Sequence, residues 1–471
     1  MKEWGIEMDI IIILLALFFL MFVAYRGFSV ILFAPIAALF AVLLTEPGHV
    51  LPFFSGVFME KMVGFIKLYF PVFLLGAIFG KVIEMSGFAK SITQFVIKLI
   101  GPARAMLAIV LVGAILTYGG VSLFVVAFAL YPFAAELFKL ADIPKRLIPG
   151  TIALGAFTFT MDAFPGSPQI QNIIPTPFFG TTTWAAPWLG FIGGMFVFIL
   201  GMVYLEWRRR QAAAKGEGYG TGHSNEPEKI ESENLPNAFI AILPLILVGV
   251  FNKWFTVLIP KYYGKTFDFS AIGMKNVPEI QIPSLAAVWA VEGALIIGIV
   301  TVLLFSFKRI KDNFNKGLNL SIGGALLATL NTASEYGFGG VIAALPGFTA
   351  VNTAMSNTIK DPLVNEAVTT TTLAGITGSA SGGMSIALAT MSETYIAQAN
   401  KLGIDPEVLH RVASMASGGM DTLPHNGAVI TLLAVTGLTH KQAYIDIFAM
   451  TIIKTIAVFV IIGLYYMLGI V

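Results

Sequence analysis

Two aspartates sit in short, similar runs inside apolar sequence. Asp162 lies in Met161–Ser167, which reads MDAFPGS, and Asp421 lies in Met420–Asn426, which reads MDTLPHN. Each run places a carboxylate and a proline where a membrane helix would otherwise continue, so each is expected to break its helix. A carboxylate at membrane depth is costly unless it is paired, protonated or bound to a cation. Two such breaks in matching halves of a chain are typical of secondary transporters.

Small polar side chains surround both breaks and are candidates for binding a small organic anion. Irregular backbone at membrane depth is tolerated where it is buried in protein or lines a wet cavity. The alternative for each aspartate is that it only caps its own broken helix. Besides the two aspartates, the predicted substrate-binding residues at the breaks are Thr160, Ser167, His425 and Asn426.

A second repeated pattern, Gly-Gly-x-Ser, occurs in Thr117–Ser122 (TYGGVS) and in Thr377–Ser385 (TGSASGGMS). Glycines permit a tight chain reversal, and Ser122 and Ser385 are expected to cap the helices that follow. A helix that starts at mid-bilayer directs free N–H groups inward and can bind an anion without Lys or Arg. The alternative is close packing of small residues. The predicted substrate-binding residues at these tips are Gly119, Gly120, Ser122, Ser381, Gly382, Gly383 and Ser385.

Three titratable side chains are candidates for proton coupling: Asp421, His425 and Glu335. His425 is the only histidine that the pattern predicts deep in the membrane, and imidazole titrates near neutral pH. Asp162 has no second titrating group in its own run, so Asp421 and His425 are expected to matter more for proton dependence. The five histidines show no metal-ligand spacing and the chain has no cysteine, so no metal site is predicted.

Composition identifies a membrane protein. The 471 residues are 56% hydrophobic and only 12% charged, against about 25% charged in a soluble domain, and the mean hydropathy is +0.82. The net charge of +2 gives no electrostatic support for binding nucleic acid. No P-loop is present, so ATP-driven transport has no support and no cofactor is predicted.

Clusters of Lys and Arg set the predicted topology, because cytoplasmic loops are enriched in these residues. Arg208–Arg210 opens the long polar segment 208–236, which is expected to be a flexible cytoplasmic linker. Lys and Arg residues flank both ends of 103–140, so this segment is predicted to enter and leave the membrane on one side. Both termini are then expected to be extracytoplasmic.

The predicted fold is an all-α polytopic membrane protein with two inverted-topology repeats, each with a re-entrant helical hairpin and a broken transmembrane helix. The predicted ranges are 1–207 for the first repeat (hairpin 103–140, broken helix 147–180), 208–236 for the linker, and 237–471 for the second repeat (hairpin 363–398, broken helix 407–435).

These motifs resemble a known family. The tip Gly119–Ser122 and the run Thr158–Pro168 (TFTMDAFPGSP) look like the gluconate:proton symporter family of the ion-transporter superfamily. Ser417–Gly427 (SGGMDTLPHNG) is more similar to its 3-hydroxybutyrate permease branch. The resemblance covers nearly the whole chain. It implies a bacterial cytoplasmic-membrane protein, a homodimer, that takes up a small hydroxy acid with protons by elevator-type motion of a transport domain.

Two other functions remain open. One is a sodium-coupled di- or tricarboxylate carrier on the same fold. A multiply charged substrate would favour Arg or Lys near the site, and the sequence offers only Arg104 and Arg411 there. The other is an intramembrane enzyme with Asp162 and Asp421 as a catalytic pair. The placement of both aspartates at repeat-related helix breaks favours transport, so the protein is not expected to be an enzyme.

Overall fold

The computed structural model describes residues 2–26, 28–223, 225–227, 235–274, 276–348, 350, 353 and 358–471. Within them almost every element is an α-helix, which confirms the all-α prediction. One short antiparallel ribbon interrupts the helices, where Thr266 pairs with Gln281 and Phe267 with Ile280. The inverted relation of the two halves stays a prediction.

The helices before the polar linker vary widely in length. They are α1 (Lys2–Tyr25), α2 (Val30–Thr45), α3 (Val50–Phe53), α4 (Met59–Met85), α5 (Phe88–Ile100), α6 (Ala105–Tyr118), α7 (Leu123–Leu140), α8 (Ile148–Ala156), α9 (Phe159–Asp162), α10 (Ile170–Ile173), α11 (Pro175–Phe179) and α12 (Pro187–Ala214).

The described elements after the linker include the ribbon strands and four 3-10 turns, of which η8 contains a predicted break. In chain order, these helices and strands, together with η8, are α13 (Ala238–Tyr263), β1 (Thr266–Phe267), β2 (Ile280–Gln281), α14 (Ala286–Ile310), α15 (Phe314–Ala344), α17 (Pro362–Thr377), α18 (Ala380–Leu402), α19 (Pro406–Gly418), η8 (Gly419–Thr422), α20 (Gly427–Thr436) and α21 (His440–Leu468).

Several helices meet the length and hydropathy needed to cross a bilayer. The described chain contains six such helical runs, and a seventh if the bent pair α5–α6 is one span. That pair bends by 103°, so α5 and α6 do not form one straight helix. The six runs are Pro47–Met85, Leu123–Leu140, Pro187–Ala214, Ala238–Tyr263, Ala286–Ala344 and His440–Leu468.

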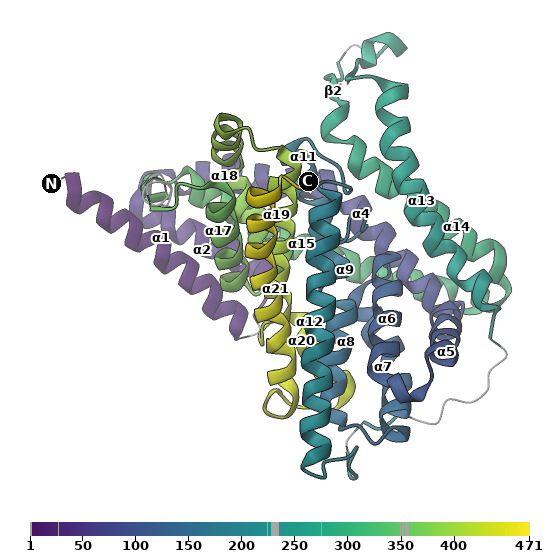
Figure 1. Cartoon of the computed structure of the whole chain (residues 1–471). Helices are drawn as coiled ribbons and strands as arrows, with labels where there is room; N and C mark the ends of the chain where they lie inside the picture. Colours follow the sequence, from purple (N-terminus) through teal and green to yellow (C-terminus); the bar gives the residue numbers. More distant parts are fainter. Residues whose placement is uncertain are drawn as a thin grey trace.

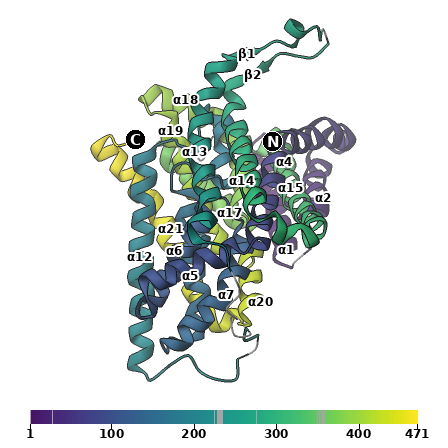
Figure 2. The same ribbon diagram turned by 90° about the vertical axis from the view of Figure 1, so that its right-hand side faces the viewer.

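Long helices frame the short ones. α4 packs along α15, α13 packs along α14, and α2 lies beside α15 with α1 packed on α2, at the other side of the molecule (Figure 1). The short helices of the two predicted breaks lie between them, in contact with α12 and α21. Figure 2 shows α12 along the edge opposite α1 and α2. This arrangement places both aspartate runs in the interior.

Two helix pairs coincide with the predicted hairpins. α6 and α7 pack against each other within 103–140, and α17 and α18 do so around 363–398. The chain reverses at a glycine in the left-handed region in each pair, Gly120 with φ +97° and Gly378 with φ +69°. Glycine adopts this conformation without steric cost. Entry of each pair from one side of the membrane stays a prediction.

The predicted linker begins later than residue 208, because helix α12 continues to Ala214, and its residues 215–223 and 225–227 make contacts with the rest of the chain. Glu217 accepts hydrogen bonds from Arg146 at 2.6 and 2.8 Å, and Glu226 pairs with Lys145 at 2.8 Å. Tyr219 is only 5% exposed, and its backbone N–H donates to Asp142 at 2.9 Å. The composition suggested nothing to bury, but the exposed ends of α7 and α8 supply matching charges.

Docking of the linker should weaken in acid. The hydrogen bond from Arg146 lowers the pKa of Glu217 below its ordinary value, which is about 4.3. A carboxylate with a lowered pKa stabilises the docked state above its ordinary pKa, and that contribution is lost as pH falls through the lowered value. Glu217→Gln should raise deuterium exchange of the Tyr219 amide by roughly two- to fivefold at pH 7, since exposed pairs contribute little.

The wild-type amide should show the same rise only below about pH 4, after correction for intrinsic exchange rates. Glu279→Gln, a change at an exposed glutamate outside the linker, is the control. Equal protection in the Glu217→Gln and wild-type proteins at pH 7 would contradict a role for the ion pair in docking.

Candidate functional site

The first break lies between α8 and α12. α8 ends at Ala156, the four-residue helix α9 ends at Asp162, and Pro165 with Gly166 (φ +79°) prevents continuation. Buried hydroxyls bond the freed carbonyls: Thr160 donates to Gly155 at 3.0 Å and Ser167 donates to Thr160 at 2.6 Å. Thr160 and Ser167 therefore support the backbone of the break in this conformation.

The second break follows α19. Helix α19 tightens into η8, which contains Asp421, and the chain becomes extended at Leu423 before Pro424. Asn426 then caps α20 by accepting from the Ala428 amide at 2.7 Å. The side-chain amide of Asn426 also donates to Gly378 at the second tip, at 2.9 Å. The predicted break and the predicted tip therefore meet.

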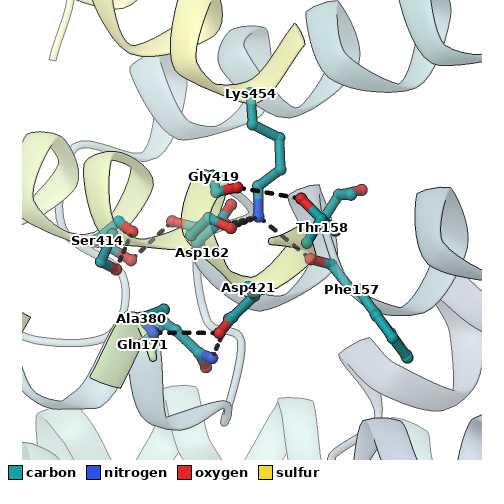
Figure 3. A network of polar contacts seen from close by, with 12 residues as sticks. Phe157, Thr158, Asp162, Gln171, Ala380, Ser414, Gly419, Asp421 and Lys454 are labelled. Carbon is teal, nitrogen blue, oxygen red and sulfur yellow. Dashed lines mark hydrogen bonds and ion pairs between the residues drawn. The ribbon is translucent and has the colours of Figure 1, made fainter. Parts of the chain in front are cut away.

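Asp162 forms a buried ion pair with Lys454 from α21. The Nζ–Oδ2 distance is 2.6 Å and each side chain is 2% exposed. The contact is a close ion pair rather than a well-aligned hydrogen bond. Lys454 also donates to the carbonyls of Phe157 and Gly418 (Figure 3). The two broken helices thus meet around one ammonium group.

Asp421 is held by neutral donors. Its oxygens accept from the side-chain amides of Gln171 at 2.8 Å and Asn426 at 3.3 Å. They also accept from the backbone N–H of Ala380, at 3.2 Å. Ala380 is the first residue of α18, so Asp421 occupies the N-terminal end of a hairpin helix (Figure 3). Asp421 therefore contacts another helix end instead of capping only its own.

Arg411 connects the two breaks through hydrogen bonds. It is fully buried and donates to the backbone carbonyl of Asp162 at 2.9 Å and to that of Ala185 at 2.7 Å. Ser414 bonds the same Asp162 carbonyl at 2.8 Å. Lys454 and Arg411 together match the charge of two ionised aspartates, so the site is balanced as a whole.

The histidine prediction needs correction. His410 is fully buried, with Thr181 at 2.6 Å and Asn172 at 3.3 Å from its ring nitrogens. His425 is only half-buried. His425 was therefore not the only deep histidine. Its ring covers Gly378, where a Cβ atom would lie 2.2 Å from the ring.

The first tip contacts the first break. The Gln169 side chain donates to the carbonyls of Thr117 at 2.7 Å and Val121 at 3.3 Å. Ser122 is the N-cap of α7, as predicted, although its side chain makes no capping bond. The Leu245 side chain from α13 lies directly over Gly119.

The second tip differs from its prediction. Ser379, not Ser385, caps α18, because its hydroxyl accepts from the Gly382 amide at 3.0 Å. Ser385 lies inside α18 and donates to the Ser381 carbonyl at 2.6 Å. The Ser381 hydroxyl lies 3.3 Å from those of Thr332 and Ser379.

Gly382 and Gly383 lie in the first turn of α18 rather than in the reversal. Glu335 from α15 lies against Gly382, where a Cβ atom would be 1.6 Å from its Oε2. Glu335 is 3% exposed, and that oxygen has no hydrogen-bond partner in the described part of the chain. Glu335 is thus close to the second tip.

The structure brings together Asp162, Asp421, Asn426 and the start of α18, with Glu335 and His425 at the margins of the second tip. The first tip contacts the loop after Asp162, which joins it to this group. Sequence reasoning missed Lys454, Gln171 and Arg411 as site residues. Of these three residues, Lys454 could have been found from the sequence, since a lone cation in an apolar span needs a partner.

A relative of known sequence establishes the family. A protein of Bacillus subtilis (strain 168) described as "Uncharacterized transporter YxjC" is 65% identical over 472 residues, covering 98% of this chain and 100% of that protein. The chain belongs to the YxjC transporter family. It is therefore a multi-pass membrane transporter, and the family points away from an enzyme. No protein-family profile matches the chain.

One solved structure shares the fold of this YxjC-family chain. It is the crystal structure of the Alcanivorax borkumensis YdaH transporter, described as having an unusual topology. The TM-score is 0.50, with 91% of this chain and 90% of that chain covered at 15% identity. At this identity the likeness concerns the fold alone.

Proposed function

We propose that the protein takes up a small hydroxy-monocarboxylate together with protons across the bacterial cytoplasmic membrane. The resemblance to the gluconate:proton symporter family, and to its 3-hydroxybutyrate permease branch, supports this substrate class. Both termini are extracytoplasmic in this proposal, and the protein works as a homodimer of elevator-type subunits. The partners are the organic anion, the proton and the lipid bilayer.

One contact carries the proposal: the Ala380 amide donates to Asp421 at the start of α18. Amides at a helix N-terminus favour an anion. An ionised Asp421 fills this position with its own charge. Protonation of Asp421 removes that charge and makes the amide available to a substrate carboxylate. Proton and anion then bind together, which is the requirement for symport.

Other residues of the site have supporting parts in this mechanism. Asn426 and Gln171 hold Asp421 in place. Ser381 places a half-buried hydroxyl in the first turn of α18, where the Gly382 amide is bonded to Ser379. Lys454 keeps Asp162 paired, so that Asp162 does not compete for the proton. His425 and Glu335 line the second tip and are the other candidates for carrying a proton.

A sodium-coupled carrier of a di- or tricarboxylate is the second candidate, because two buried cations, Lys454 and Arg411, lie at the site after all. Both are engaged, Lys454 by Asp162 and Arg411 by backbone carbonyls. This ranks the second candidate below the first.

Uptake into proteoliposomes separates the two candidates. Labelled 3-hydroxybutyrate, gluconate, succinate and citrate should be offered under an inward proton gradient, an inward sodium gradient, or neither. The proposal predicts that a hydroxy-monocarboxylate accumulates only with the proton gradient. Accumulation of succinate or citrate driven by sodium alone would favour the second candidate and reject the first.

A further inference from the structure

Glu366 is a fully buried carboxylate that the sequence patterns did not single out. It lies in α17, inside the α17–α18 hairpin, and its exposure is 0%. Neither of its carboxylate oxygens has a hydrogen-bond partner among the described residues. A charged carboxylate buried without a partner destabilises the folded protein, because nothing compensates the desolvation of the ion.

The elements packed against α17 supply no compensating charge in the described part of the chain. α18 contributes Tyr395, which is fully buried and interacts electrostatically with Glu366. Helix α1, which also packs against α17, has Asp9 as its described charged side chain, and this is an acid that offers no positive charge. The buried charged groups on α19, η8 and α21 have partners elsewhere. These are His410 and Arg411 of α19, Asp421 of η8, and Asp446 and Lys454 of α21, while Asp361 at the start of α17 bonds Tyr466 of α21.

The buried aspartates, unlike Glu366, have partners that compensate their charge. Asp162 has Lys454, and Asp421 has three N–H donors. Asp446 accepts from Arg208 at 2.6 Å and from Tyr204 at 2.9 Å. Each of these carboxylates therefore has a cation or hydrogen-bond donors that compensate its charge. Glu366 has no such support, so in this arrangement it is stable only with a proton bound.

Two buried hydroxyls lie on the same face of α17 as Glu366, toward the second tip. Thr370 lies one turn further along α17 and is fully buried, and its hydroxyl has no partner in the described chain. Thr377 lies on the same helix face, about 16 Å from Glu366 along the axis. Its hydroxyl donates to the Ser379 carbonyl at 3.1 Å, next to the Ala380 amide that holds Asp421.

We propose that Glu366 is a proton-binding site carried inside the α17–α18 hairpin. It holds a proton while buried as it is here, and it releases that proton when the surroundings of the hairpin open to water. The ligand is the proton itself, taken from and returned to water. The transport role of Glu366 rests on the proposed proton symport, whereas its bound proton does not.

Infrared spectroscopy tests the bound proton without any transport assay. The protein in lipid at neutral pH should show the carbonyl stretch of protonated carboxyl groups, and Glu366→Gln should remove a component that persists in Glu335→Gln, which changes the other buried glutamate with an unpartnered oxygen among the described residues. Glu393→Gln, which changes an exposed carboxylate on the same hairpin, should leave it in place. Tyr395→Phe should shift the band without removing it, which keeps the test available if Glu366→Gln does not fold. A Glu366 band found only in the ionised carboxylate region would overturn the proposal.

Transport assays test the coupling. In proteoliposomes, Glu366→Gln should keep substrate counterflow within a few-fold of wild type, while the number of protons moved per substrate falls and the pH dependence of uptake flattens. An unchanged proton-to-substrate ratio and pH profile would overturn the coupling role. If the wild-type protein moved none of the acids, the proposed function would fail, and the infrared result would still decide whether Glu366 holds a proton.

Discussion

Replacement of Lys454 by methionine should be among the most damaging single changes in this protein. Lys454 neutralises Asp162 at a distance of 2.6 Å, and both groups are 2% exposed. Loss of one partner of a buried ion pair leaves an unpaired charge and typically costs about 3–5 kcal/mol. We expect the purified variant to unfold at a clearly lower temperature and to show no gradient-driven uptake.

A second substitution distinguishes the effect of the unpaired charge from the effect of altered packing. Asp162→Asn in the Lys454→Met background removes the unpaired carboxylate, so the double variant should regain much of the lost thermal stability. Lys308→Met, which removes an exposed cation from α14, should change stability little. Thermal unfolding of all four proteins in one detergent is the measurement. A double variant no more stable than Lys454→Met would show that the ion pair is not the cause.

Gly383→Ala should prevent the second hairpin from closing. A Cβ atom on Gly383 would lie 2.1 Å from the Cα of Ala374 and 2.2 Å from its backbone nitrogen. The obstacle is backbone, so α17 and α18 would have to separate, at a cost of about 3 kcal/mol or more. The folded yield should fall sharply, with loss of transport in what remains.

Gly375→Ala is the matched control in the same hairpin. Its Cβ atom would meet only the Met420 sulfur, at an ordinary contact distance of 3.4 Å. Size-exclusion profiles and thermal unfolding of the two alanine variants should therefore differ strongly. Near-wild-type behaviour of Gly383→Ala would mean that α17 and α18 pack less closely than the structure shows.

The helix breaks were predictable because their causes are local. Proline and glycine in an apolar run interrupt a helix whatever surrounds them, so Asp162 and Asp421 could be placed at breaks from sequence alone. Their partners could not, because Lys454 and Gln171 are brought to them by packing between distant segments. A lone lysine in an apolar span indicates that a partner exists, but it does not identify which residue the partner is.

The two tips show how a repeated motif can mislead. In the first tip, Gly120 makes the reversal and Ser122 begins α7. In the second tip the reversal occurs before the Gly-Gly pair, at Gly378, because Ser379 caps α18. The Gly-Gly pair of the second motif consequently falls inside the first turn of α18. There Gly383 allows close packing against α17, which is the alternative that the sequence left open, rather than the tight reversal.

The linker and His410 were misjudged because burial depends on what the rest of the chain presents. A polar segment looks solvated in isolation, but Asp142, Lys145 and Arg146 offer it partners at the ends of α7 and α8. His410 resembles a residue at a helix start, yet packing of α19 against α11 buries it fully.

The most direct test of the account is the pH dependence of substrate binding to wild-type protein and to Asp421→Asn. Asparagine mimics the protonated aspartate, because it carries no charge at the start of α18. The account predicts that wild-type affinity rises as pH falls, whereas Asp421→Asn binds at every pH about as tightly as wild type does in acid. Counterflow should persist in this variant while the proton gradient no longer drives accumulation. An Asp421→Asn protein that keeps the wild-type pH dependence of binding would contradict the assignment of Asp421 as the group that couples proton to anion.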